Sequence, residues 1–121
     1  MHFPHCRHLC NYCDFFKSVP ANFDEARDVF QFRLENQWEQ QEHWFESLGY
    51  KFAPLDTLYF GGGTPSLWGA EGAKWFEFLM PEKITLAKQY EWTMEVNPGA
   101  WKEDDLRAWE DLGVNRFSMG I

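Results

Sequence analysis

Three cysteines near the N-terminus are the residues best suited to chemistry. Cys6, Cys10 and Cys13 follow a C-x3-C-x2-C spacing and are the only cysteines in the 121-residue sequence. An odd number of clustered cysteines does not form a disulfide framework, whereas thiolates are soft ligands for iron–sulfur clusters or zinc. Three thiolates hold three irons of a [4Fe–4S] cubane and leave the fourth iron open. An open iron is what a catalytic cluster needs to bind a cofactor or substrate.

Structural zinc is the alternative that this spacing leaves open. Zinc in structural sites takes four nitrogen or sulfur ligands. His2, His5 and His8 lie close to the cysteines and offer a fourth ligand for a Cys3His set. The triad by itself favours a cluster over zinc without excluding a small zinc-binding module.

A run of glycines forms a second candidate binding element. Residues 61–63 are all glycine and are followed by Thr64 and Pro65, directly after a predicted strand. Glycine lets the backbone approach a ligand closely, so N–H groups here and the Thr64 hydroxyl would contact it. A plain tight turn is the alternative. The G-x-G-x-x-G spacing of dinucleotide-binding loops is absent.

Glu95 lies at the predicted carboxyl end of a later strand, in the segment Met94-Glu95-Val96-Asn97. The carboxyl ends of parallel strands form the ligand side of a barrel, where this carboxylate would accept hydrogen bonds from ribose hydroxyls. An ion pair with Lys or Arg inside the barrel is the alternative. Arg116 carries the same ambiguity, and a structural role is favoured for it.

Alternating strands and helices must position these residues. Asn22 resembles an N-cap, and apolar residues then recur at helical spacing until Gly49. Gly and Pro punctuation separates the other segments. The expected helices cover residues 22–49, 70–79 and 103–112, the second ending before Pro81, and the expected strands cover residues 1–3, 55–60, 92–96 and 116–119.

The resulting order βαβαβαβ predicts an α/β fold with a parallel sheet or partial barrel, because crossovers between parallel strands are right-handed. We expect residues 1–121 to form one domain that is the N-terminal part of a larger core. The last strand has no covering helix after it, and a barrel strand needs neighbours on both sides.

Composition narrows the function classes. The formal net charge is −8, and the basic residues are scattered, which argues against nucleic acid as a partner. No apolar stretch approaches the roughly 18 residues of a membrane span, and residues 1–3 do not begin a secretory signal. A cytoplasmic location is the expectation.

Several motifs, taken in order, resemble the radical S-adenosylmethionine (SAM) proteins related to oxygen-independent coproporphyrinogen III oxidase, including its heme-chaperone branch. Besides the cysteine triad, the matching segments are residues 2–6 (HFPHC), 59–66 (YFGGGTPS), 94–98 (MEVNP) and 113–120 (GVNRFSMG). The resemblance runs from Met1 to Ile121 and makes zinc a minor alternative.

The resemblance implies a fold, two cofactors and a set of site residues. The fold is a partial (β/α)6 barrel with the [4Fe–4S] cluster and SAM at the carboxyl ends of the strands. Members of the family cleave SAM reductively to a 5′-deoxyadenosyl radical, which abstracts hydrogen from the substrate. The implied cluster ligands are Cys6, Cys10 and Cys13, and the implied SAM contacts are Tyr12 (adenine), Gly62, Gly63, Thr64 and Glu95 (ribose).

One position bears on the branch of the family. The oxidase branch often has a further cysteine two residues after the triad, where this chain has Phe15. The resemblance is therefore to a heme chaperone that binds and transfers heme. A coproporphyrinogen III oxidase, which decarboxylates two propionates to vinyl groups, is the alternative, and whether the protein is an enzyme depends on this branch. The implied partners are SAM, a tetrapyrrole (heme or coproporphyrinogen III) and an electron donor.

Overall fold

The computed structural model describes residues 1–120 of the chain. This part contains four parallel strands and three α-helices. The strands are β1 (His2–Phe3), β2 (Leu55–Gly62), β3 (Leu86–Val96) and β4 (Arg116–Met119). The helices are α1 (Phe23–Ser47), α2 (Gly69–Lys83) and α3 (Glu103–Leu112), with the short 3-10 helix η1 (Pro65–Trp68) before α2. This order confirms the predicted βαβαβαβ succession.

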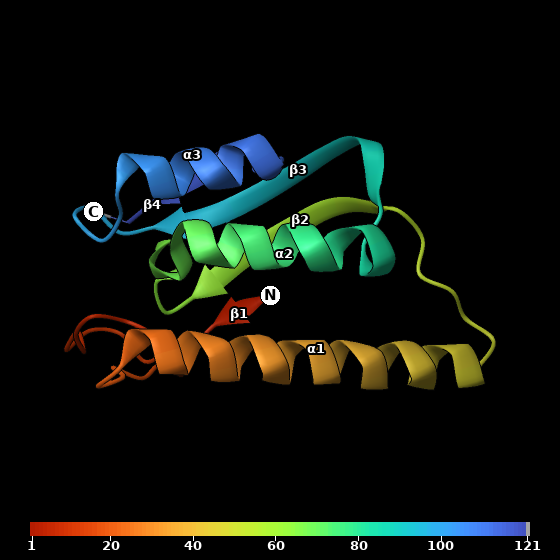
Figure 1. Cartoon of the computed structure of the whole chain (residues 1–121), viewed down its shortest axis with the longest axis horizontal. Helices are drawn as coiled ribbons and strands as arrows, with labels where there is room; N and C mark the ends of the chain where they lie inside the picture. Colours follow the sequence, from red (N-terminus) through yellow and green to blue (C-terminus); the bar gives the residue numbers. More distant parts are fainter. Residues whose placement is uncertain (121) are drawn as a thin grey trace.

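The strands lie in the sheet in chain order, β1-β2-β3-β4, and every pair is parallel. Right-handed crossovers between consecutive neighbours place all the connecting helices on one face. Figure 1 shows α2 and α3 over that face and α1 along the β1 edge. The opposite face carries none of these helices.

An aromatic core fills the space between the sheet and the helices. Alternate residues of the strands point to opposite faces, and Phe60, Trp92 and Met94 point to the helix face. They meet Phe76 of α2 and Trp109 of α3, with ring centroids 5.3 Å apart for Phe76 and Trp92 and 5.6 Å apart for Phe60 and Trp109. Such rings bury large apolar areas, which fixes the helices on the sheet and leaves the other face to polar residues.

Local sequence signals explain the ends of α1. The Asn22 side chain accepts hydrogen bonds from the N–H groups of Asp24 (3.1 Å) and Glu25 (3.2 Å), so the predicted N-cap is confirmed. Gly49 follows the helix with a φ of 82°, a left-handed conformation that glycine adopts without strain.

Two predicted boundaries were wrong. The helix expected to end before Pro81 continues to Lys83, because the N–H of Ile84 still reaches the carbonyl of Met80 at 2.8 Å beyond the proline. The strand expected at 92–96 begins at Leu86, because Leu86 and Glu91 pair with β2 across a shift in register, although the composition of this segment is mixed.

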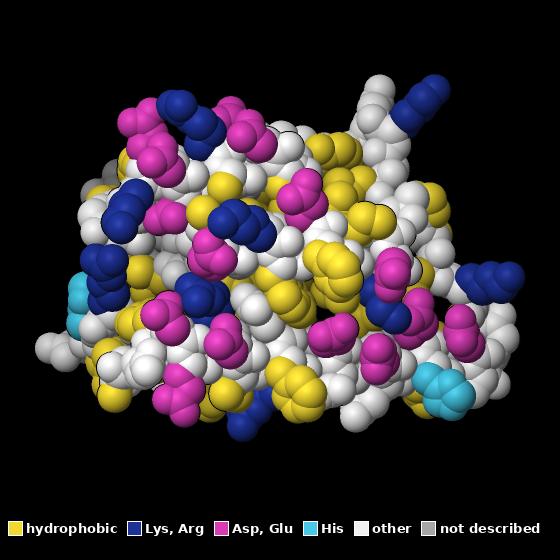
Figure 2. All heavy atoms as spheres, viewed as in Figure 1, with side chains coloured by type: hydrophobic (Ala, Val, Ile, Leu, Met, Phe, Trp, Pro, Cys, Tyr) yellow, Lys and Arg dark blue, Asp and Glu magenta, His cyan; other side chains and the backbone are white. Residues whose placement is uncertain are grey.

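The face that Figure 2 presents is covered by interspersed acidic and basic side chains, with the acidic ones more numerous. Among the described residues, no helix is both long and apolar enough to span a membrane.

Candidate functional site

A cavity of about 450 Å³ lies at the carboxyl ends of the strands. Its walls come from the loop after β1, the glycine segment that ends β2, the end of β3 and the end of β4. Figure 1 shows that loop at the end of the sheet toward which the arrows of β2 and β3 point. All eight predicted site residues line this one cavity: Cys6, Cys10, Cys13, Tyr12, Gly62, Gly63, Thr64 and Glu95.

The cysteine loop is fastened at both ends. The Cys6 N–H donates to the carbonyl of Ser18 (2.8 Å), and the Ser18 N–H donates to the carbonyl of Pro4 (2.7 Å). Cys6 is 8% exposed, whereas Tyr12 is 88% exposed at the mouth of the cavity. The loop therefore places one thiol deep in the wall and the predicted adenine contact at the rim.

The electrostatics of the loop favour a thiolate at Cys13. The backbone N–H of Phe15 and then the Lys17 ammonium, which also donates to the carbonyl of Cys13, lower the pKa of the Cys13 thiol. A thiolate is the form that binds metal. A hydrogen bond with Cys10 raises the pKa of Tyr12, so its phenol stays protonated at neutral pH.

Three cysteine thiolates are soft ligands, the donor type of iron–sulfur clusters and of zinc. Within residues 1–120, no group of three or more His, Cys, Asp or Glu side chains is arranged to hold one metal ion. Zinc ligands meet on one ion, whereas each cysteine of a cubane binds a different iron. Two nearby histidines also have other partners, because His2 Nε2 contacts the carbonyl of Phe16 and His5 Nδ1 contacts Ser18 Oγ (both 2.9 Å).

The glycine segment differs from its prediction in one respect. Its N–H groups donate to the protein: Gly61 to Met1 O (3.1 Å), Gly63 to Phe3 O (2.6 Å), Thr64 to His5 O (2.8 Å), and Gly62 to Glu95 Oε2 (3.1 Å). The expectation that these N–H groups are free to meet a ligand was therefore wrong, because the segment pairs with β1 and with Glu95.

The glycines are required by this pairing. A Cβ on Gly63 would lie 2.6 Å from the carbonyl oxygen of His5, and one on Gly62 would lie 2.8 Å from that of Phe3. Gly62 also has a φ of 114°. The glycines let β1 lie close to the end of β2, and Cys6 follows β1 after two residues.

Thr64 and Glu95 each have protein partners. The Thr64 hydroxyl donates to Cys6 Sγ (3.6 Å) and accepts from Asn97 Nδ2 (3.4 Å). Glu95 accepts from the Tyr59 hydroxyl (2.5 Å) as well as from Gly62. Arg116 instead pairs with Glu91 (3.1 Å), so Glu95 is not held by an ion pair with this arginine.

Sequence reasoning missed Tyr59 and Asn97 as members of the site. Tyr59 lies two residues before Gly61, hence on the same face of β2, and this alternation was the available signal. Asn97 entered the sequence analysis only as part of the matching segment 94–98, without a role of its own.

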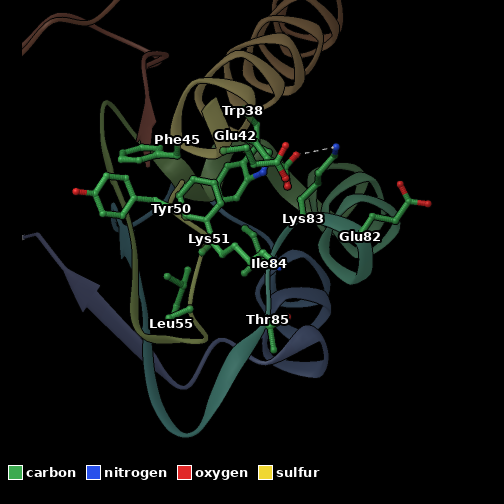
Figure 3. Close-up of a pocket in the computed structure, with 13 residues that line it drawn as sticks. Trp38, Glu42, Phe45, Tyr50, Lys51, Leu55, Glu82, Lys83, Ile84 and Thr85 are labelled. Carbon is green, nitrogen blue, oxygen red and sulfur yellow. Dashed lines mark hydrogen bonds and ion pairs between the residues drawn. The ribbon is translucent and has the colours of Figure 1, made fainter. Parts of the chain in front are cut away.

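A second cavity, of about 350 Å³, lies at the other end of the sheet. Figure 3 shows it between α1, the connection after α1 and the end of α2, beside the Lys83–Glu42 ion pair (3.3 Å). Leu55 and Thr85, which line it, stand at the amino ends of β2 and β3. None of the predicted site residues reaches this cavity, so we place the functional site at the carboxyl ends.

Comparison with known proteins gives the family. The Radical SAM superfamily matches residues 1–121. The chain belongs to the radical SAM superfamily. The chain is 31% identical to the heme chaperone HemW of Synechocystis and 32% identical to that of Lactococcus lactis. The two alignments cover 100% and 99% of the chain. Anaerobilin synthase from Escherichia coli O157:H7 is 31% identical over 121 residues and covers 100% of the chain.

A solved structure agrees with the fold of this radical SAM chain. Coproporphyrinogen III oxidase from Escherichia coli, a radical SAM enzyme, superposes with a TM-score of 0.84 at 27% identity over 99% of the chain. The predicted α/β fold and family are therefore confirmed. The chain spans 29% of the length of the two HemW relatives and 26% of that of the oxidase.

Proposed function

We propose that the chain binds a [4Fe–4S] cluster and SAM in the cavity at the carboxyl ends of its strands, as part of a heme-chaperone-like radical SAM protein. The single observation that carries the proposal is that all eight residues predicted for the two cofactors line this one cavity. They come from three separate stretches of the chain (residues 6–13, 62–64 and 95), so their meeting is a property of the fold.

Each group of residues has its own task in this proposal. Cys6, Cys10 and Cys13 would hold three irons of the cluster as thiolates, which leaves one iron without a protein ligand. When bound, the cluster and SAM together supply one-electron chemistry and a carbon radical. Tyr12 at the rim would contact the adenine, and Glu95 would accept hydrogen bonds from the ribose.

The environment of the cavity supports these tasks. Lys17 and the N–H of Phe15 favour the Cys13 thiolate, and Thr64 donates a hydrogen bond to Cys6. Gly62 and Gly63 bring the β1 backbone against the cavity, so their contacts to SAM use atoms other than the N–H groups, which already have partners.

The heme-chaperone role rests on the relatives and on Phe15. Relatives named heme chaperone occur in Synechocystis and Lactococcus lactis and cover nearly the whole chain. Phe15 lines the cavity where a further cysteine would mark the oxidase branch. Two findings favour an enzyme as the second candidate, namely the fold match to coproporphyrinogen III oxidase and the equal identity to anaerobilin synthase.

Anaerobic reconstitution with iron and sulfide tests the cluster. We expect the protein to bind about four irons and four sulfides per chain, with the broad visible absorption of a cubane. Replacing any of the three cysteines by alanine should abolish this, whereas His8→Ala, in the same loop, should not. A triple Cys→Ala variant that retained the cluster would refute the assignment.

Heme binding and turnover separate the two roles. A chaperone should bind heme, giving a saturable spectral change, and should form no protoporphyrinogen IX from coproporphyrinogen III with SAM and a reductant present. Formation of protoporphyrinogen IX by the reconstituted protein would overturn the chaperone role in favour of the oxidase.

A further inference from the structure

Tyr59 and Gly61 of β2 have no role assigned so far, and both lie beside Glu95 on the face of the sheet opposite α2 and α3. β2 and β3 pair in register with Phe60 opposite Met94, which puts Gly61 opposite Glu95. Tyr59 lies on the same face, two residues before Gly61. Its hydroxyl donates to Glu95 Oε1 at 2.5 Å, while the N–H of Gly62 donates to Oε2 at 3.1 Å. Each carboxylate oxygen is thus held by a donor from β2.

Gly61 leaves the space that this arrangement needs. A Cβ at this position would lie 2.6 Å from Tyr59 Cε1 and 3.0 Å from Glu95 Oε2. Gly61 is not among the glycines with positive φ, so its backbone conformation is open to any residue. A side chain at position 61 is therefore disfavoured for steric reasons. It would occupy the space that Tyr59 and Glu95 use for their contact.

The donors that hold Glu95 are neutral. The nearby guanidinium of Arg116 is bonded to Glu91 Oε1 (3.1 Å) and to Thr93 Oγ1 (3.3 Å). Glu95 therefore keeps its charge available to a ligand. A carboxylate has about four acceptor positions, and Tyr59 and Gly62 use two of them. The two that remain, one on each oxygen, match the two adjacent hydroxyls of a ribose.

We infer that Tyr59 and Gly61 are positioning residues that fix the Glu95 carboxylate for bidentate recognition of the ribose of SAM. The inference rests on the proposed function, in which Glu95 contacts that ribose. Tyr59 acts only through Glu95 and itself contacts no reacting atom.

Titration of the cluster-loaded protein with SAM and with free methionine tests this inference. Methionine carries the groups that bind the open iron but lacks the ribose. Tyr59→Phe should weaken SAM binding about 10-fold, the equivalent of one hydrogen bond to a charged group, and should leave cluster content and methionine affinity unchanged. Tyr90→Phe is the matched control, because it removes a hydroxyl that bonds the Gly113 carbonyl (2.9 Å) in the same sheet, away from the cavity.

A double-mutant cycle separates positioning from a general structural effect. In a Glu95→Ala background, which removes the acceptor of the Tyr59 hydroxyl, Tyr59→Phe should cause little further loss of SAM affinity. Gly61→Ala, a second route to the same contact, should also weaken SAM more than methionine. Wild-type affinity for SAM in Tyr59→Phe, or equal loss of SAM and methionine, would overturn the inference and leave the proposed function standing. Failure of the wild-type protein to bind SAM would overturn the proposed function instead.

Discussion

Individual hydrogen bonds link the cavity residues to one another before any cofactor is considered. Asn97 donates to the Thr64 hydroxyl, which in turn donates to the sulfur of Cys6 (3.4 and 3.6 Å). Thr64 is buried, so this orientation is defined by protein neighbours and not by solvent. The side chain therefore has a role toward the cysteine sulfur in addition to its predicted contact with SAM.

Replacing Thr64 by valine should lower the reduction potential of the cluster. A hydrogen bond to a ligand sulfur stabilises the reduced, more negative cluster, so its loss favours the oxidised form. Valine keeps the shape and removes the hydroxyl. Thr64→Ser, which keeps the hydroxyl, should retain the wild-type potential. Redox titration followed by electron paramagnetic resonance measures both, and an unchanged potential in Thr64→Val would contradict the role of this hydrogen bond.

At the scale of the element, the glycine segment and β1 form one structural unit. The backbone N–H of Gly63 donates to Phe3 and that of Thr64 donates to His5, and the space at Gly63 is filled by the His5 backbone. The loop that carries Cys6 starts from this unit, so the placement of the cysteines depends on the fit of a strand only two residues long.

Gly63→Val should consequently impair both cofactors. The new side chain meets backbone atoms, which cannot move aside as the end of a flexible side chain would, and it displaces β1 together with Cys6. We expect reduced iron content after reconstitution along with weaker SAM binding. Gly99→Ala is the control, because no atom lies within 4 Å of its Cβ position and it lines the same cavity, although its φ of 75° costs some strain. Loss of SAM binding with full iron content in Gly63→Val would show that the glycine serves the ligand directly.

α2 offers a matched pair for testing the aromatic core. Phe76 is 0% exposed against Trp92 and Trp109, whereas Phe78, two residues along the same helix, is 81% exposed. Phe76→Ala should lower the free energy of unfolding by about 3–5 kcal/mol through lost burial and a cavity. Phe78→Ala should change it by less than about 0.5 kcal/mol. Urea denaturation of the two variants measures the difference, and similar losses would mean that α2 does not pack as described.

The elements with strong local signals were the ones predicted from sequence. The Asn22 cap and the acidic first turn of α3 set helix starts that the structure confirms. The first half of β3 was missed because its residues are mixed in polarity and are held by pairing with β2, a long-range effect. The resemblance to the radical SAM proteins is what predicted that the cysteines and glycines share one site. The Tyr59–Glu95 contact could not be predicted, because it joins residues 36 apart in the sequence and depends on the register between β2 and β3.

At the scale of the whole molecule, the packed sheet and helices differ from the exposed cysteine loop at the carboxyl ends of the strands. The aromatic core binds sheet and helices together, whereas the cysteine loop projects from the edge with exposed Tyr12, Phe15 and Phe16. Few buried contacts and exposed backbone are typical of segments that open locally at low cost. Part of the site is therefore carried on a loop with exposed side chains, and a bound cofactor would stabilise that loop.

Trypsin cleavage should report this stabilisation. Arg7 is exposed between Cys6 and Cys10, so without the cluster the bond after Arg7 should be cut readily. A cluster bound by both flanking cysteines links the two ends of this short stretch and should suppress the cut, since binding to the folded loop opposes its opening. Lys51, in the exposed connection beside the second cavity, is the internal control and should be cut equally in both forms. Mass spectrometry of timed, anaerobic digests identifies each cut. In a Cys10→Ala variant treated with iron and sulfide, the cut after Arg7 should persist, and protection there without cluster formation would mean that the loop is ordered by the protein alone.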